Sequence, residues 1–381
     1  MKVAFLVRRF TTTGGAERYA MEVAKRLTEH CELHIYAQEI LDEVPGANFH
    51  LLKRIAEKPR YLNQMHFDIQ VSNLNKHFDV VHSHERVRNF DVLTIHCPTF
   101  RGGYLGENVA PWKRSWRQIS CDLSPRIAYY LWLEKQQFTP KCGRRFIAVS
   151  EHVMKDVVSA YPALHASDFD YAYPGVDSDK FQVSNQSVRL AERKRLGLDD
   201  KLTICFVGTE FERKGLATLV EAMAILKDKP LKLLVAGGGD IGYYTNMVIN
   251  LGIRDKVVFL GLVKNVQAVY AASDIYVLPT LSDPCPMAPL EAMASGLPAI
   301  ISNANITGVS EHIKKSEALL LEDPRNAQEL ASKILALLNP DVRGEYIKRG
   351  LELVQNITWN DTARLTLNSY YKSIEAKKAN L

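Results

Sequence analysis

The chain has 381 residues, of which 46% are hydrophobic and 24% are charged, and its formal net charge is +5. This composition is typical of a globular protein and excludes a disordered one, and the length predicts two domains. The six cysteines form no CxxC pair, which argues against a disulfide framework and a zinc cluster and favours a reducing, cytoplasmic compartment. No apolar run reaches the roughly 18 residues of a membrane-spanning helix, and the first one is too short for a signal peptide.

Short apolar runs that are typical of strands recur along the first half of the chain, at residues 3–7, 31–37, 79–84, 91–96 and 144–150. After the first run, apolar residues recur at helical spacing from Tyr19 to Leu27. Ser150 can cap a helix that opens at Glu151. Strands that alternate with helices predict a parallel sheet with right-handed crossovers.

The same pattern restarts in the second half, with apolar runs at residues 202–208, 231–239, 257–261, 274–280 and 298–302. Two successive series of this kind predict an α/β protein with two doubly wound, Rossmann-like domains. The polar stretch 173–195 is the natural hinge between domains at 1–172 and 173–358. Ligands bind beyond the carboxyl ends of the strands in such sheets, so we expect the working cleft between the two domains.

Residues 282–298, SDPCPMAPLEAMASGLP, place two carboxylates, Asp283 and Glu291, in an otherwise apolar stretch. Pro289 is well placed for the first turn of a helix that Gly296 would end. Glu291 then lies in the first helical turn, and Asp283 lies in the loop that leads into the helix.

The start of this predicted helix is a candidate anion site. Backbone N–H groups around Met287 and Ala288 lack intrahelical partners, which suits a diphosphate. Carboxylates beside a diphosphate are better suited to sugar hydroxyls. The alternative is that Glu291 only complements the helix dipole, a contribution of about 0.3–1 kcal/mol.

A pair of cations, Arg213 and Lys214, follows the predicted strand 202–208. Two cations at a strand end can neutralise the charge that develops on a departing diphosphate, and such preorganised charge is often the largest catalytic contribution. The alternative is an ordinary exposed pair of basic residues on a loop.

Two weaker signals accompany the first domain. Gly14 and Gly15 follow the first strand, where the backbone can approach a ligand closely, although the pattern is not GxGxxG and is a weak signal by itself. His96 ends a predicted strand and would point toward the cleft, although a lone histidine is more often structural. His82, His84 and Glu85 are weaker candidates still.

Positive charge and tryptophan gather in one segment, residues 101–146, which holds nine Lys or Arg residues, three acidic residues and three of the four tryptophans. This composition suits an anionic membrane surface, because tryptophan favours the interface and cations bind lipid phosphates. The alternative is that the aromatic residues are core and the cations form a solvated face. Nucleic acid is not expected, because no recognisable binding motif accompanies the charge.

Taken together, these features resemble the retaining GT-B-fold glycosyltransferases, which use nucleotide sugars without a metal. The resemblance covers nearly the whole chain and rests on the glycine turn at 14–15, the RKG at 213–215, the two carboxylates at 283 and 291, and the late ITWNDTARLTLNSYY. In this family a last helix, here from Trp359 through residue 381, crosses back to the first domain. Within the family, the chain is most similar to the glucosyltransferases of lipopolysaccharide core synthesis.

The resemblance implies a role for each candidate residue. Those that would hold the donor nucleotide sugar, UDP-linked in the nearest relatives, are Arg213, Lys214, Gly14, Gly15, Gly208, Pro286, Met287, Ala288 and Glu291, the last through the ribose hydroxyls. Asp283 would contact the transferred hexose, and His96 would lie near the C6 hydroxyl. The family usually has Glu where this chain has Asp283. Residues implied for the acceptor or the membrane are Glu17, Lys113, Arg114, Trp116 and Arg117.

The implied reaction is transfer of a hexose, glucose in the nearest relatives, with retention at the anomeric carbon, and it requires no cofactor besides the nucleotide sugar. The implied acceptor is a lipopolysaccharide core or a related envelope glycolipid, met on the cytoplasmic face of the inner membrane. Three alternatives remain: a transferase for a lipid-linked capsule or O-antigen intermediate, a sugar-nucleotide epimerase of the same fold, and an inactive nucleotide-sugar-binding protein.

Overall fold

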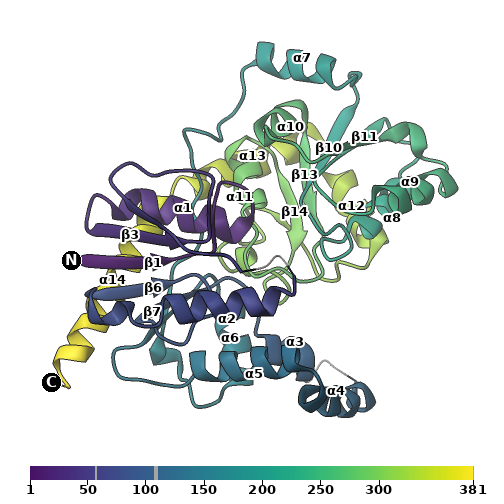
Figure 1. The fold of residues 1–381 in the computed structure, drawn as a ribbon. Helices are drawn as coiled ribbons and strands as arrows, with labels where there is room; N and C mark the ends of the chain where they lie inside the picture. Colours follow the sequence, from purple (N-terminus) through teal and green to yellow (C-terminus); the bar gives the residue numbers. More distant parts are fainter. Residues whose placement is uncertain (56–57, 107–109, 381) are drawn as a thin grey trace. The chain divides into compact units, whose positions relative to one another are not determined.

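The computed structural model describes residues 1–55, 58–106 and 110–380. The chain forms two compact units, which we call unit 1 (Met1–Pro174 with Trp359–Leu381) and unit 2 (Gly175–Thr358) (Figure 1). The sequence predicts the first boundary after residue 172. None of the helices in the described ranges is long and apolar enough to cross a membrane.

Unit 1 is built, within its described residues, on a seven-stranded sheet in the order β5-β3-β1-β6-β7-β8-β9. Its strands are β1 (Lys2–Leu6), β3 (Glu32–Ala37), β5 (Asn48–Leu51), β6 (Val80–Ser83), β7 (Val92–Ile95), β8 (Arg145–Ala148) and β9 (Phe169–Tyr171). Every neighbouring pair is parallel. A separate short pair joins β2 (Arg9–Phe10) and β4 (Glu39–Ile40). All five strands predicted for this half are present, and β2, β4, β5 and β9 are additional.

The helices of unit 1 are α1 (Gly15–Leu27), α2 (Arg60–Gln70), α3 (Phe100–Leu105), α4 (Pro111–Leu123), α5 (Pro125–Gln137), α6 (Glu151–Ala160) and α14 (Trp359–Lys378). The residues at helical spacing in α1, from Tyr19 to Leu27, are buried as predicted. Ser150 caps α6, since its side chain accepts a hydrogen bond from the N–H of Val153.

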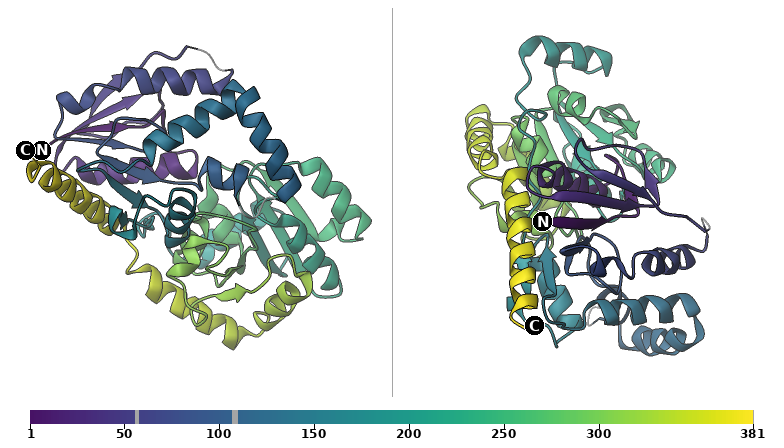
Figure 2. Two further views of the ribbon diagram at one scale, coloured as in Figure 1. Left: turned by 90° about the horizontal axis from the view of Figure 1, so that it is seen from below. Right: turned by 60° about the vertical axis from the view of Figure 1, so that its left-hand side comes forward.

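The last helix, α14, belongs to unit 1 although unit 2 precedes it in the sequence (Figure 2). Trp359, at its first position, is buried against Tyr19 of α1, with ring centroids 5.5 Å apart. The buried hydroxyl of Ser373 donates to the carbonyl of Gly143 just before β8. These contacts fix the C-terminal segment against the sheet that the N-terminal segment begins.

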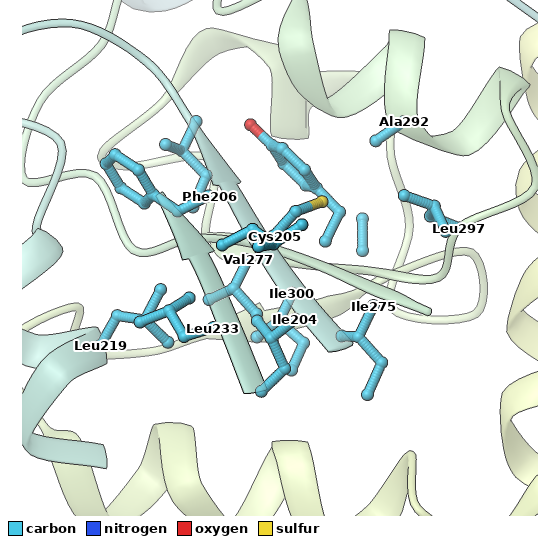
Figure 3. Close-up of a cluster of buried hydrophobic side chains, with 14 of the residues drawn as sticks. Ile204, Cys205, Phe206, Leu219, Leu233, Ile275, Val277, Ala292, Leu297 and Ile300 are labelled. Carbon is cyan, nitrogen blue, oxygen red and sulfur yellow. The ribbon is translucent and has the colours of Figure 1, made fainter. Parts of the chain in front are cut away.

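Unit 2 is built, within its described residues, on a six-stranded parallel sheet in the order β12-β11-β10-β13-β14-β15. Its strands are β10 (Leu202–Val207), β11 (Leu231–Ala236), β12 (Val257–Gly261), β13 (Ile275–Leu278), β14 (Ala299–Ser302) and β15 (Leu319–Leu321). Figure 3 shows the side chains of Ile204, Leu233, Ile275 and Ile300 meeting in the core of this sheet. All five predicted strands are present, and β15 is additional.

The helices of unit 2 are α7 (Gln186–Arg195), α8 (Leu216–Ile225), α9 (Ile241–Asn250), α10 (Val266–Ala272), α11 (Ala288–Ala294), α12 (Ala327–Ala336) and α13 (Pro340–Val354). The first of them, α7, corrects one expectation, because it lies in the stretch predicted as a hinge. Arg189 and Arg193 of α7 bind the carboxylate of Asp274, at 2.7 Å and 3.5 Å, just before β13. This part of the stretch is therefore anchored to unit 2.

Both sheets have a topological switch point, where the strand order reverses. In unit 1 it lies between β1 and β6, and in unit 2 between β10 and β13. Loops that leave the carboxyl ends of such strands diverge to opposite faces of the sheet and leave a crevice between them. The switch points are therefore where a functional site is expected in each unit.

The core of unit 1 also contains a buried titratable side chain, that of His82 in β6. Its Nδ1 atom is bonded to the hydroxyl of Tyr370 in α14 (2.6 Å) and its Nε2 atom to the hydroxyl of Thr94 in β7 (2.7 Å). The side chain is fully buried. Burial, and to a smaller extent the charge on His96, lowers the pKa of His82 to about 3.

We expect the stability of the protein to fall as the pH falls. Below about pH 6.5 the unfolded chain protonates His82, whereas the folded chain does not until about pH 3, so each pH unit in this window costs about 1.4 kcal/mol. Urea unfolding at several pH values between about 7 and 5 measures this slope. In H82F, the free energy of unfolding should change with pH by about 1.4 kcal/mol less per pH unit, because one fewer proton is taken up on unfolding. An unchanged slope would contradict the assignment of this pH dependence to His82.

Candidate functional site

The switch point of unit 2 brings together three of the predicted residues. Lys214 is hydrogen-bonded to the carboxylate of Asp283, and Arg213 lies 3.5 Å from the same oxygen. Asp283 and Lys214 are largely buried, with side chains 8% and 11% exposed. The two cations follow β10 and the carboxylate follows β13, so both sides of the switch point contribute.

Backbone packing explains why the cations lie there. Gly215, which precedes α8, has a φ of +75°, and a Cβ on it would lie 1.9 Å from the carbonyl oxygen of Pro279. Only glycine allows this approach. The N–H of Leu281 and the hydroxyl of Thr280 both donate to the carbonyl of Arg213, at 2.8 Å and 3.2 Å. The loop after β10 is therefore bonded directly to the loop after β13.

Asp283 itself is held by its backbone. Its N–H donates to Ile306 (3.1 Å) and its carbonyl accepts from Gly308 (3.2 Å). Arg213 has a second acidic partner, Glu210, at 2.8 Å. The two cations thus have two carboxylate partners, so an anionic ligand must compete with carboxylates that are already in place.

Glu291 lies in the first turn of α11, as the sequence predicts, and Gly296 follows that helix with a φ of +81°. The carboxylate of Glu291 is 4% exposed and accepts a hydrogen bond from the hydroxyl of Tyr270 in α10, at 3.3 Å. It does more than complement the helix dipole, because a buried tyrosine from another helix fixes its position. The pKa of Tyr270 is raised well above 10, chiefly by burial and then by the charge of Glu291, so this hydroxyl stays a donor.

The remaining donor-site candidates of unit 2 surround these groups. Pro286 is buried and Met287 and Ala288 are half-buried where α11 begins. Gly208 follows β10, and a Cβ on it would lie 3.5 Å from the side chain of Lys214. Gly208 thus adjoins the Lys214 stem at the end of β10.

In unit 1, Gly14 and Gly15 begin α1 and are exposed to solvent. Gly14 has a φ of +100°, and the carboxylate of Glu17 folds over its Cα. A side chain at position 14 would be strained and would displace that carboxylate. The backbone at the start of α1 is therefore exposed to solvent, and the carboxylate of Glu17 lies beside Gly14.

His96 lines a cavity of about 280 Å³ at the carboxyl ends of β6 and β7 in unit 1. Two ion pairs border the cavity: Arg8 with Glu85, at 2.8 Å, and Arg86 with Glu134, at 4.0 Å. Polar side chains that line a concave space suit a hydroxyl-rich ligand such as a sugar. The glycines of α1 and Glu17 are not among the residues that line this cavity.

His84, a weak candidate from the sequence, contacts His96 directly. Its Nδ1 atom is 2.8 Å from Nε2 of His96, and the two rings are stacked with centroids 5.1 Å apart. Burial lowers the pKa of His96 to about 4 and that of His84 well below 6.5. Both rings are therefore neutral near pH 7. The HSH spacing at 82–84, which puts two histidines on one side of a strand, was the available signal.

The basic segment forms three helices that pack together in unit 1, α3, α4 and α5 (Figures 1 and 2). Trp112 and Trp116 of α4 are 65% and 70% exposed, so the reading of these two tryptophans as core is wrong. Lys113 is exposed as well, and its ammonium lies 5.3 Å from the ring of Trp112.

Two predicted lipid-binding cations are engaged within the protein. Arg114 donates to the carbonyl of Gly106 (2.9 Å), and Arg117 donates to the carbonyl of Tyr104 (3.1 Å). The guanidinium of Arg117 also covers the ring of Tyr104. Both arginines are half-buried. Arg114 and Arg117 therefore join α4 to the end of α3. The sequence did not indicate this structural role.

Another residue that the sequence left unexplained is Glu134, whose charge interrupts the apolar face of α5. It is 2% exposed, and its carboxylate accepts from the N–H groups of Phe100 and Arg101 and from the hydroxyl of Tyr161, at 2.6–2.9 Å. A carboxylate at the start of α3 satisfies amides that have no intrahelical partner. Glu134 therefore fixes the position of α3.

Within residues 1–55, 58–106 and 110–380, no group of three or more His, Cys, Asp or Glu side chains has an arrangement that could hold a metal ion.

Comparisons with known proteins extend this picture. The family described as Glycosyl transferases group 1 matches residues 188–352, and the family described as Glycosyltransferase Family 4 matches residues 13–180. Together they cover most of the chain. An uncharacterised glycosyltransferase of Methanocaldococcus jannaschii is 30% identical over 237 residues, which span 60% of this chain and 60% of the relative's length.

Two solved structures share the fold. WaaG, a glycosyltransferase involved in lipopolysaccharide biosynthesis, superimposes with a TM-score of 0.80 at 18% identity, covering 96% of this chain and 98% of WaaG. HepE of Anabaena in complex with UDP-glucose superimposes with a TM-score of 0.72 at 16% identity, covering 100% of both chains. Identities this low establish the fold alone. The two structures show that the protein has the GT-B fold, and the two family matches assign each half of the chain, residues 13–180 and residues 188–352, to a glycosyltransferase family.

Proposed function

We propose that this protein transfers a hexose, glucose, from UDP-glucose to a lipopolysaccharide core or a related envelope glycolipid, with retention at the anomeric carbon. The observation that carries the proposal is the convergence of Arg213 and Lys214 on Asp283 at the switch point of unit 2, with Glu291 buried in the adjoining helix. The fold shared with WaaG and with the UDP-glucose complex of HepE supports this acceptor and this donor.

Each residue of this group suits one part of the donor. Arg213 and Lys214 neutralise the diphosphate as the bond to the sugar breaks, because preorganised cations in a water-poor site stabilise developing negative charge. Glu291, oriented by Tyr270, accepts hydrogen bonds from the ribose hydroxyls. Asp283 accepts one from the hexose and in doing so exchanges its partner Lys214 for the substrate.

The chemistry of retention follows from the same charges. An oxocarbenium-like centre forms as the diphosphate departs, and the acceptor hydroxyl attacks on the face that the diphosphate leaves. The leaving phosphate oxygen takes the acceptor proton, so the proton and the negative charge meet on one atom. The role of the protein is to stabilise that oxygen, and Lys214 is the best-buried cation of the group, with its side chain 11% exposed.

A panel of nucleotide sugars tests the function. Thermal shift and release of free nucleoside diphosphate are measured with and without a rough-type lipopolysaccharide acceptor. We expect UDP-glucose to stabilise the protein and the acceptor to accelerate release of UDP. Epimerisation of the sugar without release would identify an epimerase, and binding without either reaction would identify an inactive binding protein; both outcomes contradict the proposal.

Lys214→Ala is expected to reduce transfer about 10²- to 10³-fold, the loss that follows removal of one charge-stabilising donor. The exposed Lys227, which is also in unit 2, provides a matched control as Lys227→Ala. Initial rates at saturating donor measure the effect. Turnover of K214A equal to that of K227A would remove Lys214 from the mechanism.

Asp283→Asn is expected to separate binding from transfer. Removal of the carboxylate frees two cations from an internal partner, so free UDP should bind several-fold more tightly, while transfer should fall because the hexose loses a charged acceptor. Calorimetry with UDP and rates with UDP-glucose measure the two effects, with the exposed Asp228→Asn as the control. Weaker UDP binding in D283N would contradict the assigned charge balance.

We also propose that α4 docks on the anionic cytoplasmic face of the inner membrane. The support is the exposure of Trp112 and Trp116 beside Lys113. Tryptophan is favoured at the level of lipid headgroups, and each basic residue near an anionic surface contributes about 1 kcal/mol. Replacement of Arg114 or Arg117 would also disturb α3, because both side chains bind carbonyls at its end. Membrane docking is therefore tested at Trp112, Trp116 and Lys113.

Replacement of Trp112, Trp116 and Lys113 by Ser is expected to abolish most cosedimentation with vesicles that contain phosphatidylglycerol. The variant should keep its transfer rate toward a detergent-dispersed acceptor, because these side chains are on the surface. Ser at Tyr243 and Ile249, which are 59% and 53% exposed in unit 2, is the control for general loss of apolar surface. Cosedimentation that survives the first set of changes but not the second would refute the docking of α4.

A further inference from the structure

The unit 1 cavity contains a hydrogen bond whose direction determines what His96 can do. One bond joins Nδ1 of His84 to Nε2 of His96, at 2.8 Å. Because burial lowers the pKa of both rings, each is neutral and carries a single N–H. One ring donates and the other accepts. The nitrogen of His96 that remains for a ligand, Nδ1, is therefore either a donor or an acceptor, according to that choice.

Packing holds His84 in one orientation. Its ring centroid is 4.5 Å from that of Phe5 in β1 and 4.4 Å from that of His82 in β6. The ring of Tyr19 in α1 lies at 75° to that of His96, with centroids 5.0 Å apart. The pair thus contacts aromatic rings from three elements, and these contacts restrict the orientation of His84.

The far nitrogen of His84 decides the direction. Its Nε2 atom is shielded from solvent and makes no hydrogen bond with any of the described residues. If His96 were the donor, His84 would carry an unpaired N–H at this position. If His84 is the donor, its Nε2 atom carries no proton, and only a lone pair is left without a partner. Buried N–H groups without a partner are rarer than unpaired acceptors, so the second arrangement is favoured.

We propose that His84 is a positioning residue that donates from Nδ1 to His96 and so fixes His96 as the Nδ1–H tautomer, which presents a hydrogen-bond donor to a substrate hydroxyl. The inference rests on the proposed function, because it assigns the hydroxyl to a nucleotide sugar or its acceptor. It narrows the ligand chemistry: a group that only donates at this position is disfavoured, and an oxygen with a free lone pair is accepted. The partner that orients an imidazole commonly sets its tautomer in this way.

Nitrogen NMR of the histidine-labelled protein tests the tautomer directly, without need of activity. Long-range proton–nitrogen correlation distinguishes protonated from bare ring nitrogens, and the signals of His96 are identified by their loss in H96N. We expect Nδ1 of His96 to be protonated and Nε2 to be bare. Protonation at Nε2 in the wild-type protein would overturn the proposal.

Variants at position 84 then separate positioning from packing. His84→Phe keeps a ring but no donor, so His96 should become a mixture of tautomers, and kcat should fall about 10- to 100-fold with a smaller change in the KM for donor. His84→Asn places an amide donor near the former Nδ1 and should restore the Nδ1–H signal and part of kcat. If the ring-nitrogen signals of His96 are the same in H84F as in the wild-type protein, His84 does not set the tautomer of His96.

A second histidine pair supplies the matched control. In the sheet of the same unit, Nδ1 of His34 is 2.9 Å from Nε2 of His50, and those rings are stacked as well. His50→Phe should alter the signals of His34 and leave those of His96 and the transfer rate unchanged. If transfer is undetectable with every donor, the proposed function fails, while the spectra still decide whether His84 sets the tautomer.

Discussion

The site depends on one constraint, the parallel pairing of every neighbouring strand in both main sheets. Parallel strands all end at the same edge, so the loops that follow them must gather there, and at a switch point they separate to opposite faces. In unit 2 this brings the loop after β10 to the loop after β13, where Leu281 and Thr280 both bond to the carbonyl of Arg213. In unit 1 it places the ends of β6 and β7, with His84 and His96, at one cavity.

Charge balance follows from that geometry. The two cations at the switch point of unit 2 have carboxylate partners. Lys214 is paired with Asp283, and Arg213 with both Asp283 and Glu210. Buried ions need partners, because an unpaired one would lose its hydration without compensation. A diphosphate alone must therefore displace a carboxylate, whereas a nucleotide sugar can offer phosphate to the cations and a hydroxyl to Asp283 at the same time. This charge balance therefore suits the proposed donor, an intact nucleotide sugar, better than free diphosphate.

Periodicity and capping residues were enough to predict the sheets, since buried parallel strands are continuous apolar runs and Ser150 and Gly296 mark helix ends. The edge strand β5 alternates polar with apolar residues over only four positions, and β15 is only three residues long, so neither has a pattern long enough to be recognised. The helix α7 was mistaken for a hinge because its polar surface is typical of a linker, and only its two arginine contacts to Asp274 reveal its anchorage. Pairs that depend on tertiary contact, such as Glu291 with Tyr270, have no local signature.

The basic segment, residues 101–146, shows why composition alone does not reveal which charged side chains are free to bind a membrane. Glu134 and Asp156 bind the amides at the start of α3, and Arg114 and Arg117 bind carbonyls at its end. A helix leaves four N–H and four C=O groups without intrahelical partners, which is more than the six residues of α3, so α3 depends on side chains that bind both of its ends. Two of the three cations predicted to bind lipid, Arg114 and Arg117, therefore hold α4 against α3, and the exposed tryptophans of α4 keep their position because of these contacts.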